Sequence, residues 1–124
     1  MFMDIGAGLI IAVIINLFFE PTNPNVYIVL FGPLTALAPD IDFLVYASKK
    51  DFKQDRWTYR HRYLLHHPIP FVLAGVVILF PINQLFALAW LCCTIYHFAH
   101  DTFNAFGIPW LSPFSEIIRD LSDE

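Results

Sequence analysis

The feature that most constrains this chain is the length of its apolar stretches. Residues 4–19 and 26–47 approach or reach the roughly 20 apolar residues that a helix needs to cross a bilayer, and two further runs, 68–82 and 84–106, have shorter apolar cores. The sequence is 57 % hydrophobic and only 15 % charged, which is typical of a membrane protein. We therefore predict an all-α fold, an integral membrane bundle of about four short or broken transmembrane helices that forms a single domain over residues 1–124.

Charge is distributed unevenly and predicts how the bundle is oriented. Six of the seven Lys and Arg residues lie between residues 48 and 62. By the positive-inside rule this loop faces the cytoplasm, so that in a multi-pass chain of four spans both termini are also cytoplasmic. Residues 112–121 alternate apolar and charged side chains, as expected of an amphipathic segment at the membrane surface. A net charge of −4 gives no indication of a nucleic-acid partner.

The second apolar stretch is interrupted by prolines and contains two carboxylates. Gly32-Pro33 and Pro39 predict a kinked or broken helix, and Asp40 and Asp42 follow in the motif PDID. Ionisable residues at the edge of a membrane span are costly and are usually paired or functional, which favours metal ligation. Two residues at i and i+2 diverge on an ideal helix, so both carboxylates serve one site only if Pro39 starts a new helix or if they bridge two ions. The alternative is that an aspartate caps a second half-helix.

The motif HRYLLHHP gathers three histidines and Arg62 before the third apolar run, and Arg60 directly precedes it. Imidazole is a ligand for Zn, Mn and similar ions, and we predict that His61 and His66 serve as ligands. His67 points elsewhere on a helix, so it is a candidate for general acid or for a group that orients a ligand. Arg62, with Arg60 as second choice, is suited to stabilise charge on a phosphoryl group.

The motif HFAHDTFN places further candidate ligands near the end of the last apolar run. His97 and Asp101 are spaced i, i+4 and therefore share one helical face, with His100 between them at i+3. We predict His97 and Asp101 as ligands and His100 as a general acid or a residue that orients a ligand. The alternative is a hydrogen-bonded His–Asp pair that stabilises the bundle.

These three polar segments meet if the four-span topology holds, because each lies at the cytoplasmic end of a span. We expect them to enclose one or two divalent metal ions, most plausibly Zn or Mn. The predicted metal ligands are Asp40, Asp42, His61, His66, His97 and Asp101.

The order of these motifs resembles the YdjM-type family of small bacterial inner-membrane proteins, which are regarded as metal-dependent hydrolases. PDID, HRYLLHH and HFAHD, followed by Gly107 and the PFS of residues 113–115, correspond to segments typical of that family and span most of the chain. The resemblance implies an inner-membrane location and points to the same six ligands. The chain departs from the family pattern at Tyr63, Leu65 and His67, where Gly, Thr and Ser are frequent.

The sequence thus leads to a hypothesis of a membrane-bound hydrolase in which metal-activated water attacks an ester, most plausibly the phosphoester of a lipid head group reached from the bilayer. Three alternatives remain open at this stage. One is a non-catalytic metal-binding or transport protein, and another is a haem-binding bundle, against which the three aspartates argue. The third is a structural or partner-binding membrane protein in which the polar residues form an interhelical network.

Overall fold

The protein is described here by a computed structural model in which residues 2–41, 65 and 67–103 are placed. Within these residues every regular element is a helix, which confirms the predicted all-α class for this part of the chain. The elements are α1 (Phe2–Phe19), α2 (Val26–Leu37), the short 3-10 helix η1 (Ala38–Asp40), α5 (Pro68–Leu79) and α6 (Gln84–Thr102).

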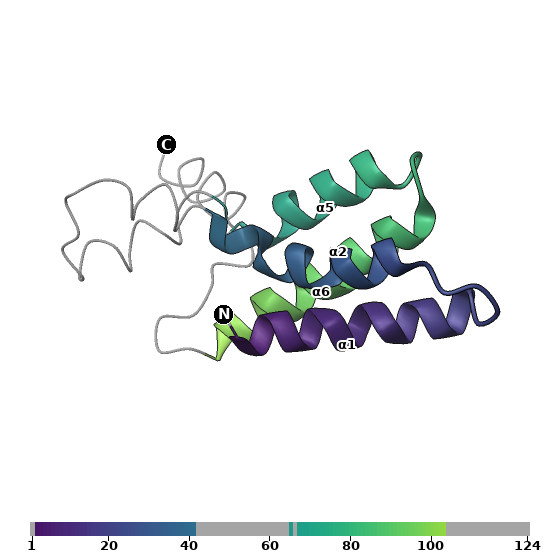
Figure 1. Cartoon of the computed structure of the whole chain (residues 1–124). Helices are drawn as coiled ribbons and strands as arrows, with labels where there is room; N and C mark the ends of the chain where they lie inside the picture. The colour runs from purple at the N-terminus through teal and green to yellow at the C-terminus, as the bar shows by residue number, and fades with distance from the viewer. Residues whose placement is uncertain (1, 42–64, 66, 104–124) are drawn as a thin grey trace, which may run out of the picture.

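The four α-helices run alternately in opposite directions, as Figure 1 shows. Short connections join α1 to α2 and α5 to α6 at one end of the bundle. α6 packs against each of the other three helices and so forms the centre of the bundle. As a consequence, the start of α1, the end of α2 with η1, the start of α5 and the end of α6 all lie at the opposite end.

The α1–α2 pair is held close by small residues. A Cβ atom on Gly8 would lie 2.6 Å from the carbonyl oxygen of Gly32 and 2.9 Å from Cβ of Ala36. Gly8 and Ala12 on one helix, and Gly32 and Ala36 on the other, repeat the four-residue spacing of small side chains that lets membrane helices approach closely. This close crossing brings the first turn of α1 next to the end of α2.

Asparagines organise the two short connections. The side chain of Asn16 donates to the carbonyl oxygen of Asn25 and accepts from its backbone N–H, both at 2.9 Å. Asn25 in turn caps α2, and Asn83 caps α6 by accepting from the backbone N–H groups of Leu85 and Phe86. These bonds satisfy polar groups that would otherwise be exposed at helix ends beside apolar surface.

The second apolar stretch is less disrupted than predicted. The helix continues through Pro33 to Leu37, and only around Pro39 does it change to the 3-10 turn of η1. Residues 42–47 of this predicted segment and the predicted amphipathic segment 112–121 lie outside the described residues.

Among the described helices, α1 is the one long and apolar enough to cross a membrane, and α2 and α5 are shorter apolar helices. With 12 residues each, these two would extend about 18 Å against the roughly 30 Å of a bilayer core. Of the four short or broken transmembrane helices predicted, α1 is thus the one whose described length and composition suffice for a full span. Large apolar side chains are nevertheless exposed along α1, α2 and α5, among them Ile10, Leu34 and Val77.

Candidate metal centre

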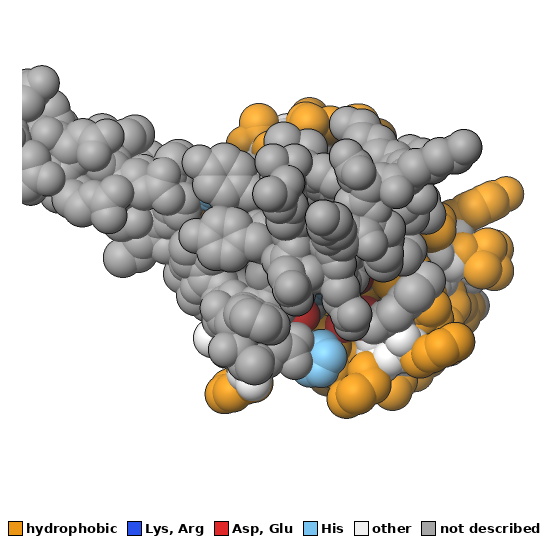
Figure 2. Space-filling model, turned by 90° about the vertical axis from the view of Figure 1, so that its left-hand side faces the viewer, with side chains coloured by type: hydrophobic (Ala, Val, Ile, Leu, Met, Phe, Trp, Pro, Cys, Tyr) orange, Lys and Arg blue, Asp and Glu red, His pale blue; other side chains and the backbone are white. Residues whose placement is uncertain are grey.

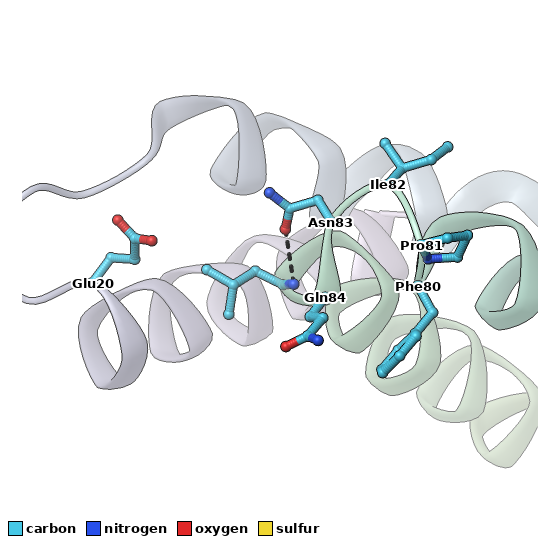
Figure 3. A pocket seen from close by; sticks show the side chains of 7 residues that line it. Glu20, Phe80, Pro81, Ile82, Asn83 and Gln84 are labelled. Carbon is cyan, nitrogen blue, oxygen red and sulfur yellow. Dashed lines mark hydrogen bonds between the residues drawn. The ribbon is translucent and has the colours of Figure 1, made fainter.

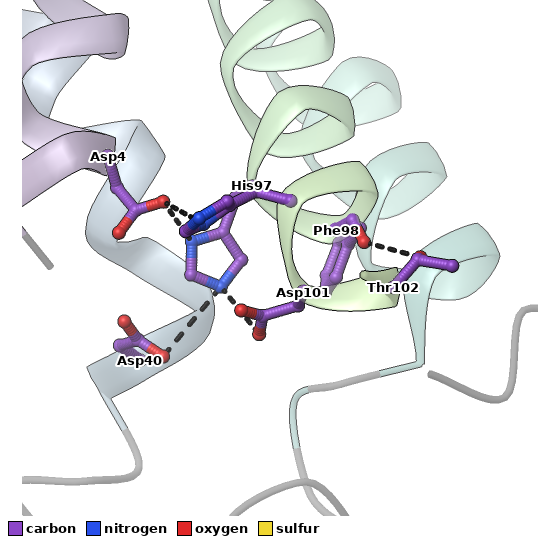
Figure 4. A network of polar contacts seen from close by, with 7 residues as sticks. Asp4, Asp40, His97, Phe98, Asp101 and Thr102 are labelled. Atoms are coloured by element: carbon purple, nitrogen blue, oxygen red, sulfur yellow. Dashed lines mark hydrogen bonds and ion pairs between the residues drawn. The ribbon is translucent and has the colours of Figure 1, made fainter. Parts of the chain in front are cut away.

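Three polar side chains from three separate elements meet where α1 begins and α6 ends. Asp4 is in the first turn of α1, Asp40 ends η1, and His97 lies in the last two turns of α6. One potential ligand atom of each residue lies within 4.8 Å of those of the other two. Figure 4 shows the group from close by, with Asp101 at its edge.

His97 is the centre of this group. Only 1 % of the residue is exposed, and its ring faces carboxylates on both sides. Nδ1 lies 3.7 Å from Oδ1 of Asp4, whereas Nε2 lies 3.7 Å from Oδ1 of Asp40 and 3.5 Å from Oδ2 of Asp101. Two ligands of a tetrahedral ion with bonds of 2.0–2.1 Å are separated by about 3.4 Å, so the spacing around Nε2 is close to that of a ligand set.

The local structure explains how these side chains converge. His97 and Asp101 occupy one face of α6 because they are one helical turn apart. Pro39 lies within the 3-10 turn of η1, which carries Asp40 toward that face instead of continuing α2. Asp4 reaches the same point because α1 crosses α2 at Gly8, one turn away.

His100 extends the group toward its exposed side. Its Nδ1 lies 3.3 Å from Oδ1 of Asp4, the same oxygen that faces His97. The ring stacks on Tyr96 with the two planes 11° apart, and 31 % of its side chain is exposed. Figure 2, which views the molecule from this end, shows histidine and acidic side chains here with hydrophobic side chains to the sides.

The donor set fits a divalent cation. Among the described residues three carboxylates lie around one imidazole, and such a concentration of negative charge in a largely apolar setting favours a bound cation. Imidazole nitrogen together with carboxylate oxygen suits Zn and Mn. A haem-binding bundle would instead have histidines facing each other across the helices, whereas both ring nitrogens of His97 face carboxylates.

The structure brings together part of the predicted site. Asp40, His97 and Asp101 lie in one group, and His100 contacts it through Asp4. His67, predicted as a possible acid, is the N-cap residue of α5 and is half-buried at the same end of the bundle. The remaining predicted residues lie outside the described part of the chain; they are Asp42, His61, Arg62 and His66.

Asp4 was not among the predicted site residues. The signal that identifies it is the one applied to Asp40, an ionisable residue inside an apolar segment. Asp4 is the one charged residue of α1, and it is 2 % exposed.

A concave region lies at the opposite end of the bundle, beside the α5–α6 connection. It encloses about 380 Å³ and is lined by Glu20 and residues 80–85 (Figure 3). Its lining offers one carboxylate and no imidazole, so it lacks the donors of the group around His97.

Comparison with known families supports the membrane setting of this group. The model of the family described as YdjM inner membrane protein matches residues 3–122, which is nearly the whole chain. No curated protein and no solved structure matches the chain.

Proposed function

The chain belongs to the YdjM inner membrane protein family, and on that premise we propose that it is a membrane-bound, metal-dependent hydrolase. The observation that carries the proposal is the convergence of Asp4, Asp40 and His97 from three elements to within 4.8 Å. Ionisable side chains within an apolar bundle are costly and usually have a paired or functional role, and imidazole together with carboxylates is a donor set that suits a divalent ion.

In this proposal His97, Asp40 and Asp101 hold a divalent ion, Zn or Mn. When bound, such an ion activates water for attack on an ester and polarises the bond under attack. The side chains of Asp40, Asp101 and His100 are 28 %, 16 % and 31 % exposed, so the group has an accessible side from which a substrate can approach. His97 and Asp4 form its buried side.

The proposed substrate is an ester carried by a lipid, with a phosphoester as the first candidate. Its support is the exposed apolar surface of α1, α2 and α5, which would face acyl chains. A lipid whose tails lie along this surface would bring its head group to the accessible side of the group, where Asp40, Asp101 and His100 are partly exposed.

A non-catalytic metal-binding protein is the second candidate. The burial of Asp4 and His97 favours it, because structural metal sites are closed, whereas catalytic sites keep an open position. Metal binding without hydrolysis of any ester would distinguish this candidate from the hydrolase.

The test is metal content and esterase activity of detergent-purified protein. We expect near-stoichiometric Zn or Mn in the wild type, lost in Asp40→Ala and His97→Ala, together with metal-dependent hydrolysis of phosphoester lipids. Thr94→Ala is a matched control, because Thr94 is a buried polar residue of α6 whose hydroxyl donates to the carbonyl oxygen of Trp90 outside the group. Absence of metal from folded wild type after supplementation with both ions would refute the proposal.

A further inference from the structure

The two ring nitrogens of His97 face different partners. Nδ1 points to Asp4, whereas Nε2 points to Asp40 and Asp101, as Figure 4 shows. One imidazole gives only one nitrogen to a given ion, and the other nitrogen then carries a proton that needs an acceptor. The carboxylates around His97 therefore cannot all have the same role.

The surroundings distinguish the two sides of the ring. Nε2 faces two carboxylates from two different elements, η1 and α6, and both are partly exposed. Nδ1 faces Asp4, whose side chain is 3 % exposed. The Nε2 side thus offers more anionic ligands and the access that a substrate needs, and the Nδ1 side is enclosed.

We propose that Asp4 is a positioning residue that accepts the Nδ1–H of His97 and so presents Nε2 to the metal. This inference rests on the proposed metal site and assigns one of its residues a role. A carboxylate that holds the second nitrogen of a metal-bound histidine fixes both the tautomer and the orientation of the ring.

The geometry needs only a small adjustment for this role. The Nδ1 to Oδ1 distance of 3.7 Å is about 0.7 Å longer than an ordinary N–H···O hydrogen bond. Asp4 lies on a helix of its own, so its position does not depend on the face that His97 shares with Asp101. Oδ1 of Asp4 also lies 3.3 Å from Nδ1 of His100, which ties the carboxylate to α6 at a second point.

Two substitutions at Asp4 separate positioning from ligation. Asn keeps an oxygen that accepts a hydrogen bond but is a poor metal ligand, whereas Ala removes both functions. For the full chain in detergent we expect Asp4→Ala to weaken zinc affinity about 10- to 100-fold and Asp4→Asn to weaken it less than about tenfold. The electronic spectrum of the cobalt-substituted protein should keep its band positions in Asp4→Asn, because the ligands are unchanged.

A direct measurement complements the variants and does not depend on activity. In protein labelled with ¹⁵N-histidine and loaded with zinc, the signals of His97 should show a proton on Nδ1 and metal on Nε2. The signals of His100 are recognised by their loss in the His100→Gln variant, so that they are not confused with those of His97.

The outcomes separate the inference from the proposed function. Metal bound through Nδ1, or equal loss of zinc with altered cobalt bands in both Asp4 variants, would make Asp4 a ligand and overturn the inference while leaving the metal site in place. A folded wild type that binds none of zinc, manganese and cobalt would overturn the proposed function, and the inference with it.

Discussion

Two buried polar side chains, Asn16 and His97, show how differently such residues are accommodated in this apolar bundle. Asn16 is 2 % exposed, and both of its amide atoms bond to the backbone of Asn25. That arrangement explains the residue without any ligand. His97 is equally buried, but three carboxylates lie 3.5–3.7 Å from its ring nitrogens, an arrangement that favours a cation.

The Asn16 interaction gives a stability prediction that is independent of the metal. Asn16→Ala removes two hydrogen bonds from a part-buried backbone segment and should lower the free energy of unfolding by about 1–3 kcal/mol. Asn16→Asp keeps the acceptor for the N–H of Asn25 but sets a buried carboxylate oxygen against the carbonyl oxygen of Asn25, so it should destabilise the protein at least as much as Asn16→Ala. Unfolding by SDS in mixed micelles, followed by circular dichroism, measures both. An Asn16→Ala protein as stable as the wild type would show that these bonds contribute nothing.

How far the site is visible in the sequence depends on where its residues lie. The pairing of His97 with Asp101 follows from their spacing on one helix, and Asp40 was placed near them through membrane depth. Asp4 belongs to α1, which packs against α2 through glycines, and no spacing along the sequence relates Asp4 to α6. The proximity of Asp4 to His97 results from packing between distant helices, and therefore it could not be predicted from the sequence.

At the scale of elements, glycines allow α1 and α2 to cross closely, and prolines bear on where α2 ends. Pro39 was expected to interrupt the second helix, and the 3-10 turn of η1 forms there; Pro33 was also expected to do so, but α2 continues through it. The packing of α2 between α1 and α6 compensates for the hydrogen bond that a proline cannot donate. The helix therefore ends where Asp40 can reach His97.

Two glycines of α1 provide a matched pair to test this crossing. A Cβ on Gly8 would lie 2.6 Å from backbone of α2, whereas a Cβ on Gly6 would meet nothing within 4 Å. Gly8→Ala should destabilise the protein by about 1–3 kcal/mol, because the helices must separate. Gly6→Ala should be neutral or stabilise it by up to about 1 kcal/mol, because alanine favours helix. SDS unfolding curves measure the change in the free energy of unfolding for both variants.

Zinc affinity provides a second measurement on the Gly8→Ala and Gly6→Ala variants. Separation of α1 from α2 at Gly8 moves Asp4 relative to Asp40, so Gly8→Ala should also weaken zinc binding, whereas Gly6→Ala should not. Equal stability and equal zinc affinity in the two variants would show that the crossing does not position the site.

At the scale of the whole molecule, the family and the exposed apolar side chains agree on a membrane setting. The family is described as inner membrane protein, and large apolar side chains are exposed on all four described α-helices, most of them on α1, α2 and α5, to an extent unusual for a soluble protein. The alternating helices separate two chemically different ends. One has the Asp–His group, and the other has the two short connections.

Orientation is the property of the whole molecule that can be tested most directly. Six of the seven Lys and Arg residues lie between residues 48 and 62, in the segment that joins the end of η1 to the start of α5. Because cytoplasmic loops are rich in these residues, the end with the Asp–His group should face the cytoplasm and the short connections should face outward. The proposed chemistry would then act on head groups of the inner leaflet.

Single cysteines in a background of Cys92→Ala and Cys93→Ala report this orientation. Ile82→Cys, in the α5–α6 connection, should react with a membrane-impermeant maleimide in intact spheroplasts. Phe103→Cys, at the other end of α6 and 90 % exposed, should react only after the membrane is permeabilised. The reverse pattern would place the metal group outside, and equal reaction of both before permeabilisation would show that α6 does not cross the membrane. Retention of bound zinc by the cysteine-free background confirms that the substitutions leave the site intact, so that the labelling describes the same fold that holds His97 between its carboxylates.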